Sequence, residues 1–117
     1  MVETSLEGTP MTAINVSTDF TRFPSGRFKK NGSTSGEAFR EQFLEKPIAE
    51  GQKVVVILDG TVGYGSSFLE EAFGGLVRKL QMSADRVLSL LDFQATDSSL
   101  VDEIKQYVKD ADTKLSR

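Results

Sequence analysis

The chain has 117 residues, 38% of them apolar, which suits one compact domain, and a net charge of -3, which is not typical of nucleic-acid-binding proteins. It contains no cysteine and no histidine. This composition excludes disulfides, thiol nucleophiles and imidazole bases, so we expect a protein that is not an enzyme and holds no metal or cofactor.

The first residues, MVETSLEGTP, have neither the basic region nor the apolar core of a signal peptide. We expect residues 1–12 to be a flexible tail and residues 13–117 to be one domain. No apolar run approaches the roughly 18 residues that span a membrane. Because the lack of cysteine also fits the cytoplasm, we expect a cytoplasmic protein.

The segment after the tail predicts a strand and a turn. Residues 13–17, AINVS, alternate apolar and polar side chains as a half-buried strand does. Phe20, Phe23 and Phe28 then flank the turn-forming triplet Pro24-Ser25-Gly26. We predict an antiparallel hairpin or loop that lays these aromatic rings on the core.

A first helix is predicted to begin at Thr34, because Thr34 and Glu37 form the T-x-x-E pattern of a capping box. Pro47 should kink or end this helix. Its inward residues are predicted to be Ala38, Phe39, Phe43 and Leu44.

A second helix is predicted from Ser67 to Gln81. Ser67 and Glu70 form another capping box, and the pair Gly74-Gly75 indicates close internal packing. The apolar residues follow at the spacing of one helical face. They are Leu69, Ala72, Phe73, Leu76, Val77 and Leu80.

Two apolar runs predict further strands, KVVVILD over residues 53–59 and RVLSLLDF over residues 86–93. The triplet Asp97-Ser98-Ser99 offers N-caps for a last helix. Its predicted inner face is Val101, Ile104, Val108, Ala111 and Leu115. This order predicts an α/β fold, a mixed sheet with a mainly parallel core and an early antiparallel hairpin, covered by about three helices.

The stretch VVVILDGTVGYGSSFLEEAFGGLVRKL resembles the STAS domain of anti-sigma-factor antagonists and sulfate transporters. In those domains the loop before the second helix reads Asp-Ser-Ser-Gly, and in the antagonists its first serine is the phosphorylation switch. Ser66 and Ser67 match the two serines, whereas Gly65 replaces the aspartate and Phe68 replaces the glycine.

Together with FPSGRFKKNGSTSGEAFREQFL, this stretch is similar to the STAS-like domains of unknown function of bacteria and archaea. The resemblance implies a STAS-like fold. Some members are thought to lie beside, or to be fused to, histidine-kinase-like ATPases, which implies a regulatory partnership.

The leading hypothesis is a non-enzymatic regulatory domain that binds a partner protein, such as a histidine-kinase-like ATPase. Ser67 is predicted to cap the second helix, which leaves Ser66 either as the candidate phosphoacceptor or as an ordinary polar loop residue. The candidate partner-binding residues are Tyr64, Gly65, Ser66, Ser67 and Phe68.

The alternative hypothesis is a small-ligand module that binds a nucleotide or another anion at the basic loop before the first helix. The candidate residues are Arg27, Lys29, Lys30, Ser33, Thr34 and Ser35. The loop is not a P-loop, because no Gly-Lys-Ser/Thr occurs in the chain. A solvated basic loop that ends in an N-cap would explain the same residues.

Overall fold

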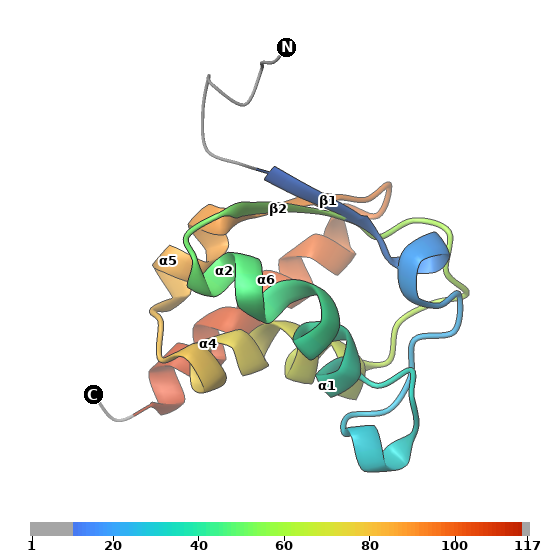
Figure 1. Ribbon diagram of the computed structural model, residues 1–117, viewed down its shortest axis with the longest axis horizontal. Coiled ribbons are helices and arrows are strands. Elements are labelled where there is room, and N and C mark those ends of the chain that lie inside the picture. Colours follow the sequence, from blue (N-terminus) through green and yellow to red (C-terminus); the bar gives the residue numbers. More distant parts are fainter. Residues whose placement is uncertain (1–10, 116–117) are drawn as a thin grey trace.

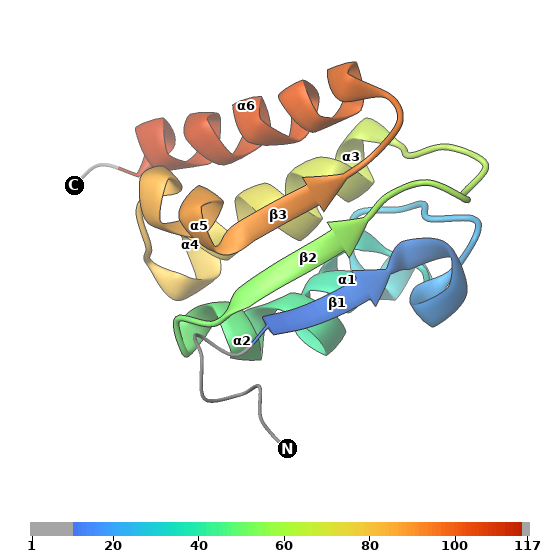
Figure 2. The same cartoon turned by 90° about the horizontal axis from the view of Figure 1, so that it is seen from above.

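The structure is a computed structural model that describes residues 11–115. Its sheet has three strands in the order β1-β2-β3 (Figure 2). Their bounds are β1 (Met11–Asn15), β2 (Lys53–Ile57) and β3 (Leu91–Gln94). All pairings are parallel. Residues 1–10 of the predicted tail lie outside the described residues, whereas residues 11 and 12 already belong to β1.

The predicted antiparallel hairpin is wrong, because the chain leaves the sheet directly after β1. It forms a π-helical turn, η2 (Val16–Phe20). The Asn15 side chain accepts a hydrogen bond from the Ser17 amide (3.2 Å), and the Asp19 carboxylate accepts one from the Asn15 amide (2.8 Å). Such local side-chain bonds compete with strand pairing.

The three phenylalanines of this segment have different surroundings. The Phe20 ring packs on the core, with its centroid 5.3 Å from that of Phe39 and 5.9 Å from that of Phe43. Phe23 is 60% exposed, and Phe28, which precedes the short 3-10 helix η3 (Lys29–Asn31), is 39% exposed. The prediction that these rings cover the core is therefore confirmed for Phe20 and wrong for the other two.

The first long helix runs through α1 (Gly36–Phe39), the π-helical turn η4 (Arg40–Leu44) and α2 (Glu45–Ala49). Its cap is Ser35, one residue after the predicted Thr34, and the Ser35 hydroxyl accepts from the Ala38 amide at 3.1 Å. Pro47 does not end the helix, which continues for two more residues.

The second long helix runs through α3 (Ser66–Leu69), the π-helical turn η5 (Glu70–Gly74) and α4 (Gly75–Leu80). The predicted range is confirmed to within one residue at each end. Of the predicted inner face, Leu69, Ala72, Phe73, Leu76 and Val77 are fully buried, and Leu80 is partly buried.

The run over residues 86–93 was predicted to be a strand, but only its last residues are one. Its first residues belong to helix α5 (Ala84–Leu90), which the Ser83 hydroxyl caps by accepting from the Arg86 amide at 3.1 Å. Val87 and Leu90 are buried at helical spacing, and β3 begins only at Leu91.

The last helix, α6 (Ser98–Lys114), begins as predicted, with Asp97 as its N-cap. Figure 1 shows α1, α2, α4 and α6 on the same side of the sheet. Val54 and Val56 of β2 belong to the core on that side. None of the helices in residues 11–115 is long and apolar enough to cross a membrane.

Candidate functional site at the carboxyl edge of the sheet

The loops that follow the three strands lie at one edge of the sheet, because parallel strands all end on the same side (Figure 2). The Asp59 carboxylate, after β2, accepts hydrogen bonds from the Thr96 amide (3.0 Å) and hydroxyl (2.8 Å), after β3. These bonds hold the pKa of Asp59 below its usual value. Asp59 thus joins two loops, as a structural residue.

Gly60 brings the β2 loop against the turn that follows β1. Its φ is +101°, and a Cβ at this position would lie 2.5 Å from the Ser17 hydroxyl oxygen. Only glycine adopts this conformation and also leaves the required space. The two loops are therefore held in close contact.

Within residues 11–115, the second long helix begins without a side-chain cap and with its first amides unbonded, which we call an open start. Gly65 is its N-cap and supplies no side-chain cap, so the predicted Ser67–Glu70 capping box is wrong. Ser66 and Ser67 are both exposed in the first turn. In the described part of the chain, no protein acceptor is bonded to the amides of Ser66, Ser67 or Phe68.

Glu70 does not take part in capping the helix, because two arginines bind its carboxylate. Its carboxylate accepts from Arg27 Nη1 (2.6 Å) and from Arg78 Nη1 (2.6 Å). Burial opposes ionisation of Glu70, but the bonds from Arg78 and Arg27 outweigh it, so the pKa of Glu70 is lowered. A charge-assisted bond of this kind is stronger than a bond to a neutral amide.

The predicted partner-binding residues differ in how exposed they are. Gly65, Ser66 and Ser67 are exposed, whereas Phe68 is fully buried and cannot contact a partner. Tyr64 is half-buried and donates to the Leu58 carbonyl at 2.8 Å. Burial raises the pKa of Tyr64 to about 12, so it is neutral at physiological pH.

The sequence did not reveal two exposed apolar side chains, one in the loop after β2 and one in the segment paired with it. Val62 is 66% exposed and Phe23 is 60% exposed. The Val62 amide donates to the Arg22 carbonyl at 2.9 Å, so the two segments lie side by side. We call Phe23, Val62, Tyr64 and Ser66 the loop surface. The available signal was Val62 itself, an apolar residue inside a polar, glycine-rich loop.

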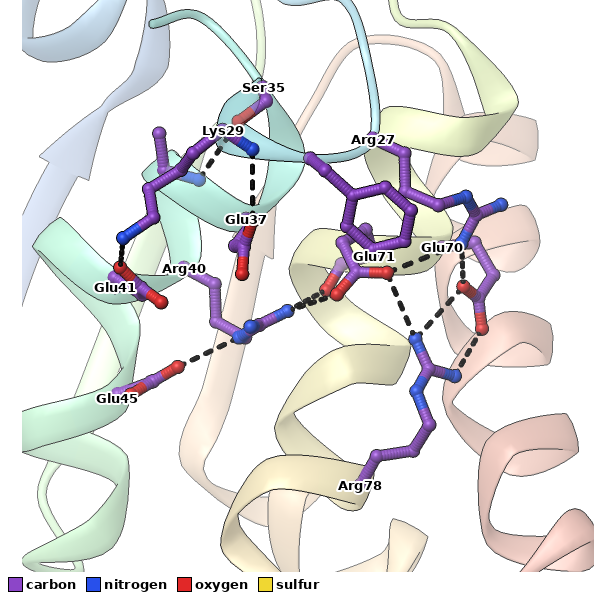
Figure 3. Close-up of polar contacts among 12 residues, drawn as sticks. Arg27, Lys29, Ser35, Glu37, Arg40, Glu41, Glu45, Glu70, Glu71 and Arg78 are labelled. Atoms are coloured by element: carbon purple, nitrogen blue, oxygen red, sulfur yellow. Dashed lines mark hydrogen bonds and ion pairs between the residues drawn. The ribbon is translucent and has the colours of Figure 1, made fainter. Parts of the chain in front are cut away.

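The basic loop already has carboxylate partners (Figure 3). Arg27 binds Glu70, and Lys29 Nζ lies 2.6 Å from Glu41. The Lys30 ammonium lies over the Phe28 ring, 5.8 Å from its centroid.

The helix start beside this loop is closed. The Gly36 amide donates to the Gly26 carbonyl (2.9 Å), and the Glu37 amide donates to the Arg27 carbonyl (3.0 Å). Ser35 is buried as the cap, Thr34 is partly buried, and Ser33 is exposed. The six predicted anion-site residues therefore lie in one loop, but two of their cations and the first amides of the adjoining helix are already engaged.

Arg40 links the two long helices through a buried ion pair that the sequence did not reveal (Figure 3). It is 4% exposed, and its Nη1 donates both to the Glu71 carboxylate and to the Glu71 carbonyl, each at 2.7 Å. Burial alone would lower the pKa of Arg40, but hydrogen bonds with Glu45 and Glu71 outweigh it, so the pKa is raised.

The Gly74-Gly75 pair explains how Arg40 fits. In the π-helical turn the Gly75 amide donates to the Glu70 carbonyl, which leaves the Glu71 carbonyl for Arg40. A Cβ on Gly75 would collide with the Arg40 guanidinium. The predicted close internal packing is confirmed, and this glycine pair was the signal for the buried arginine.

Within residues 11–115, no group of three or more acidic residues could hold a metal ion. A family model described as a STAS-like domain of unknown function (DUF4325) matches residues 35–100, which is more than half of the chain. No curated protein and no solved structure gives a significant match. The matched range includes both long helices, β2 and the serine pair.

Proposed function

Since this chain belongs to the STAS-like domains of unknown function, we propose that it is a non-enzymatic, cytoplasmic regulatory domain that binds a partner protein through the loop surface. The observation that carries the proposal is the exposed Ser66 at an uncapped helix start, with the exposed apolar Val62 in the loop that leads into it. The partner we propose is a histidine-kinase-like ATPase, on the family resemblance.

The loop surface is suited to binding because its scaffold is fixed. The Asp59–Thr96 and Val62–Arg22 hydrogen bonds hold the loops in place, so docking would cost little conformational entropy. Single exposed apolar residues are common, but two on adjacent loops offer a contact that a partner can bury.

Phosphorylation of Ser66 is the proposed switch. A phosphate adds about 1.5 to 2 negative charges, and the unpartnered amides at the helix start would stabilise it. The same charge at the end of the Val62 loop would weaken binding of an apolar partner surface. The domain would therefore stay folded while the partner is released.

The test is binding of a purified histidine-kinase-like ATPase from the same cell to defined variants. We expect Phe23→Ser with Val62→Ser to weaken binding at least about tenfold, the scale of one lost apolar anchor. Ser66→Asp should weaken it, and Ser66→Ala should not.

The matched control is Ser98→Asp, because Ser98 is also an exposed serine at the first position of a helix. Equal binding of the Phe23/Val62 variant and the parent would refute the docking surface. If Ser66→Asp binds like Ser66→Ala, the switch is refuted while the docking surface stands.

A further inference from the structure

A second surface, which does not include the serines, lies between strand β3 and helix α6. A groove of about 350 Å³ is open there. Figure 2 shows α6 running alongside β3. The groove is lined by Leu88, Leu91, Asp92, Phe93, Val101, Lys105 and Lys109.

The backbone of β3 is available from this groove. Among residues 11–115, β3 is an edge strand, paired with β2 on one side only. The Gln94 carbonyl accepts from the Leu58 amide at 2.8 Å, so Gln94 points toward β2. Because neighbouring residues of a parallel strand point to opposite sides, the N–H and C=O of Phe93 face the groove.

The groove is apolar at its base and basic on its helical wall, where two lysines outnumber the one carboxylate of the lining, Asp92 of β3. Leu88, Phe93 and Val101 are partly exposed in it. Lys105 and Lys109 follow Val101 at intervals of four residues, so they form one stripe along α6. Neither lysine has an ion pair within the described residues, whereas Lys29 has one and Arg40 has two.

We propose that this groove binds an extended, acidic segment of a partner protein, which adds to the sheet as a strand beside β3. Backbone bonds to Phe93 would supply part of the affinity, in the manner of β-strand addition. Apolar side chains of the segment would fill the groove, and its carboxylates would pair with Lys105 and Lys109. Strand addition from a second copy is disfavoured, since it would bring the lysines of both copies together.

The probe is the peptide Val-Thr-Glu-Thr-Glu-Thr-Val, whose glutamates and valines share one face of a strand. The control peptide carries lysine in place of both glutamates. We expect the acidic peptide to bind at least about fivefold more tightly, and to slow hydrogen exchange of the Phe93 amide, as a backbone bond requires. Charge repulsion with Lys105 and Lys109 should weaken the control.

The variant Lys105→Glu with Lys109→Glu should reverse the preference between the two peptides. Lys79→Glu with Lys114→Glu is the matched control, because both residues are exposed lysines outside the groove lining, and it should leave the preference unchanged. The proposal is overturned by absent or equal binding of the peptides, or by unchanged exchange at Phe93. It is also overturned if the chain alone dimerises with protection of Phe93.

Discussion

The two long helices begin with the same sequence pattern, a hydroxyl residue followed by a glutamate, yet their first turns differ. At the first helix, Ser35 is buried and the amides of Gly36, Glu37 and Ala38 all have acceptors. At the second helix, Ser66 is exposed and the first amides have none in the described residues. The closed start stabilises the fold, and the open start is the one at which we propose the switch.

The acceptors available to the first amides cause this difference. The first helix has the Ser35 hydroxyl and the Gly26 and Arg27 carbonyls, whereas neither glutamate turns back on its own helix as a capping box requires. Glu37 accepts from the Lys29 amide at 2.9 Å, and Glu70 accepts from Arg27 and Arg78. The sequence pattern is therefore insufficient where another donor reaches the carboxylate.

The largest expected effect comes from breaking the link between the two helices. Arg40→Leu should lower the free energy of unfolding by about 3–5 kcal/mol, because Glu71 remains buried without its main partner. Urea unfolding measures this change. Arg40→Leu with Glu71→Leu is the control and should lose less. A loss below about 1 kcal/mol for the single variant would show that the ion pair is not a principal link between the helices.

The next effect separates the two helix starts directly. Ser35→Ala should cost about 1 kcal/mol, because it removes a cap. Ser66→Ala should cost no more than about 0.5 kcal/mol, because its hydroxyl caps nothing. Thermal or urea unfolding of the two variants gives both values. Equal losses would contradict the distinction between a closed and an open start.

A smaller effect concerns Glu70 and pH. Its folded-state pKa lies below the usual value of 4.5, so the stability that it contributes is complete above that pH and is lost as the pH falls through the folded pKa. Glu70→Gln should make the decline in unfolding free energy on acidification shallower. Unfolding curves measured from neutral to acidic pH test this. An identical decline in both proteins would show that Glu70 gains nothing from its arginines.

The smallest effect is expected at the closed helix start. Addition of a nucleotide panel should leave the melting temperature unchanged, because the first amides of the adjoining helix and two of the cations of the basic loop are already engaged. A ligand at about 100 times its Kd would stabilise the protein by about 2.7 kcal/mol. Such a shift, abolished by Lys29→Glu with Lys30→Glu, would favour the small-ligand module instead.

The sequence predicted elements where one periodicity extends over many residues. The second helix and α6 followed from their apolar spacing, and β2 followed from its β-branched run. The run over residues 86–93 was misread, because a short apolar run fits a helix and a strand equally well. The cap at Ser83 decided between them.

The start of the second helix was predicted to within one residue, but the surroundings of the candidate residues were not. Ser66 is the first helical residue and does not precede the cap, Phe68 is in the core and Phe23 is on the surface. Contacts between residues far apart in the sequence, such as Arg27 with Glu70 and Arg40 with Glu71, are not contained in local patterns. Val62 and the Gly74-Gly75 pair were local signals of an unusual position, but they did not identify the partner residues.

Because the described strands are all parallel, the loops at their carboxyl ends lie at the opposite end of the molecule from the turns at their amino ends. Every loop that carries the proposed binding function follows a strand, whereas Glu50 and Gln81 lie in turns that precede strand or helix starts at the opposite end. Both side chains are exposed, and the chain has no cysteine. A single cysteine introduced at Glu50 would therefore carry a fluorophore or a surface tether at a unique site, with the loop surface facing away from it.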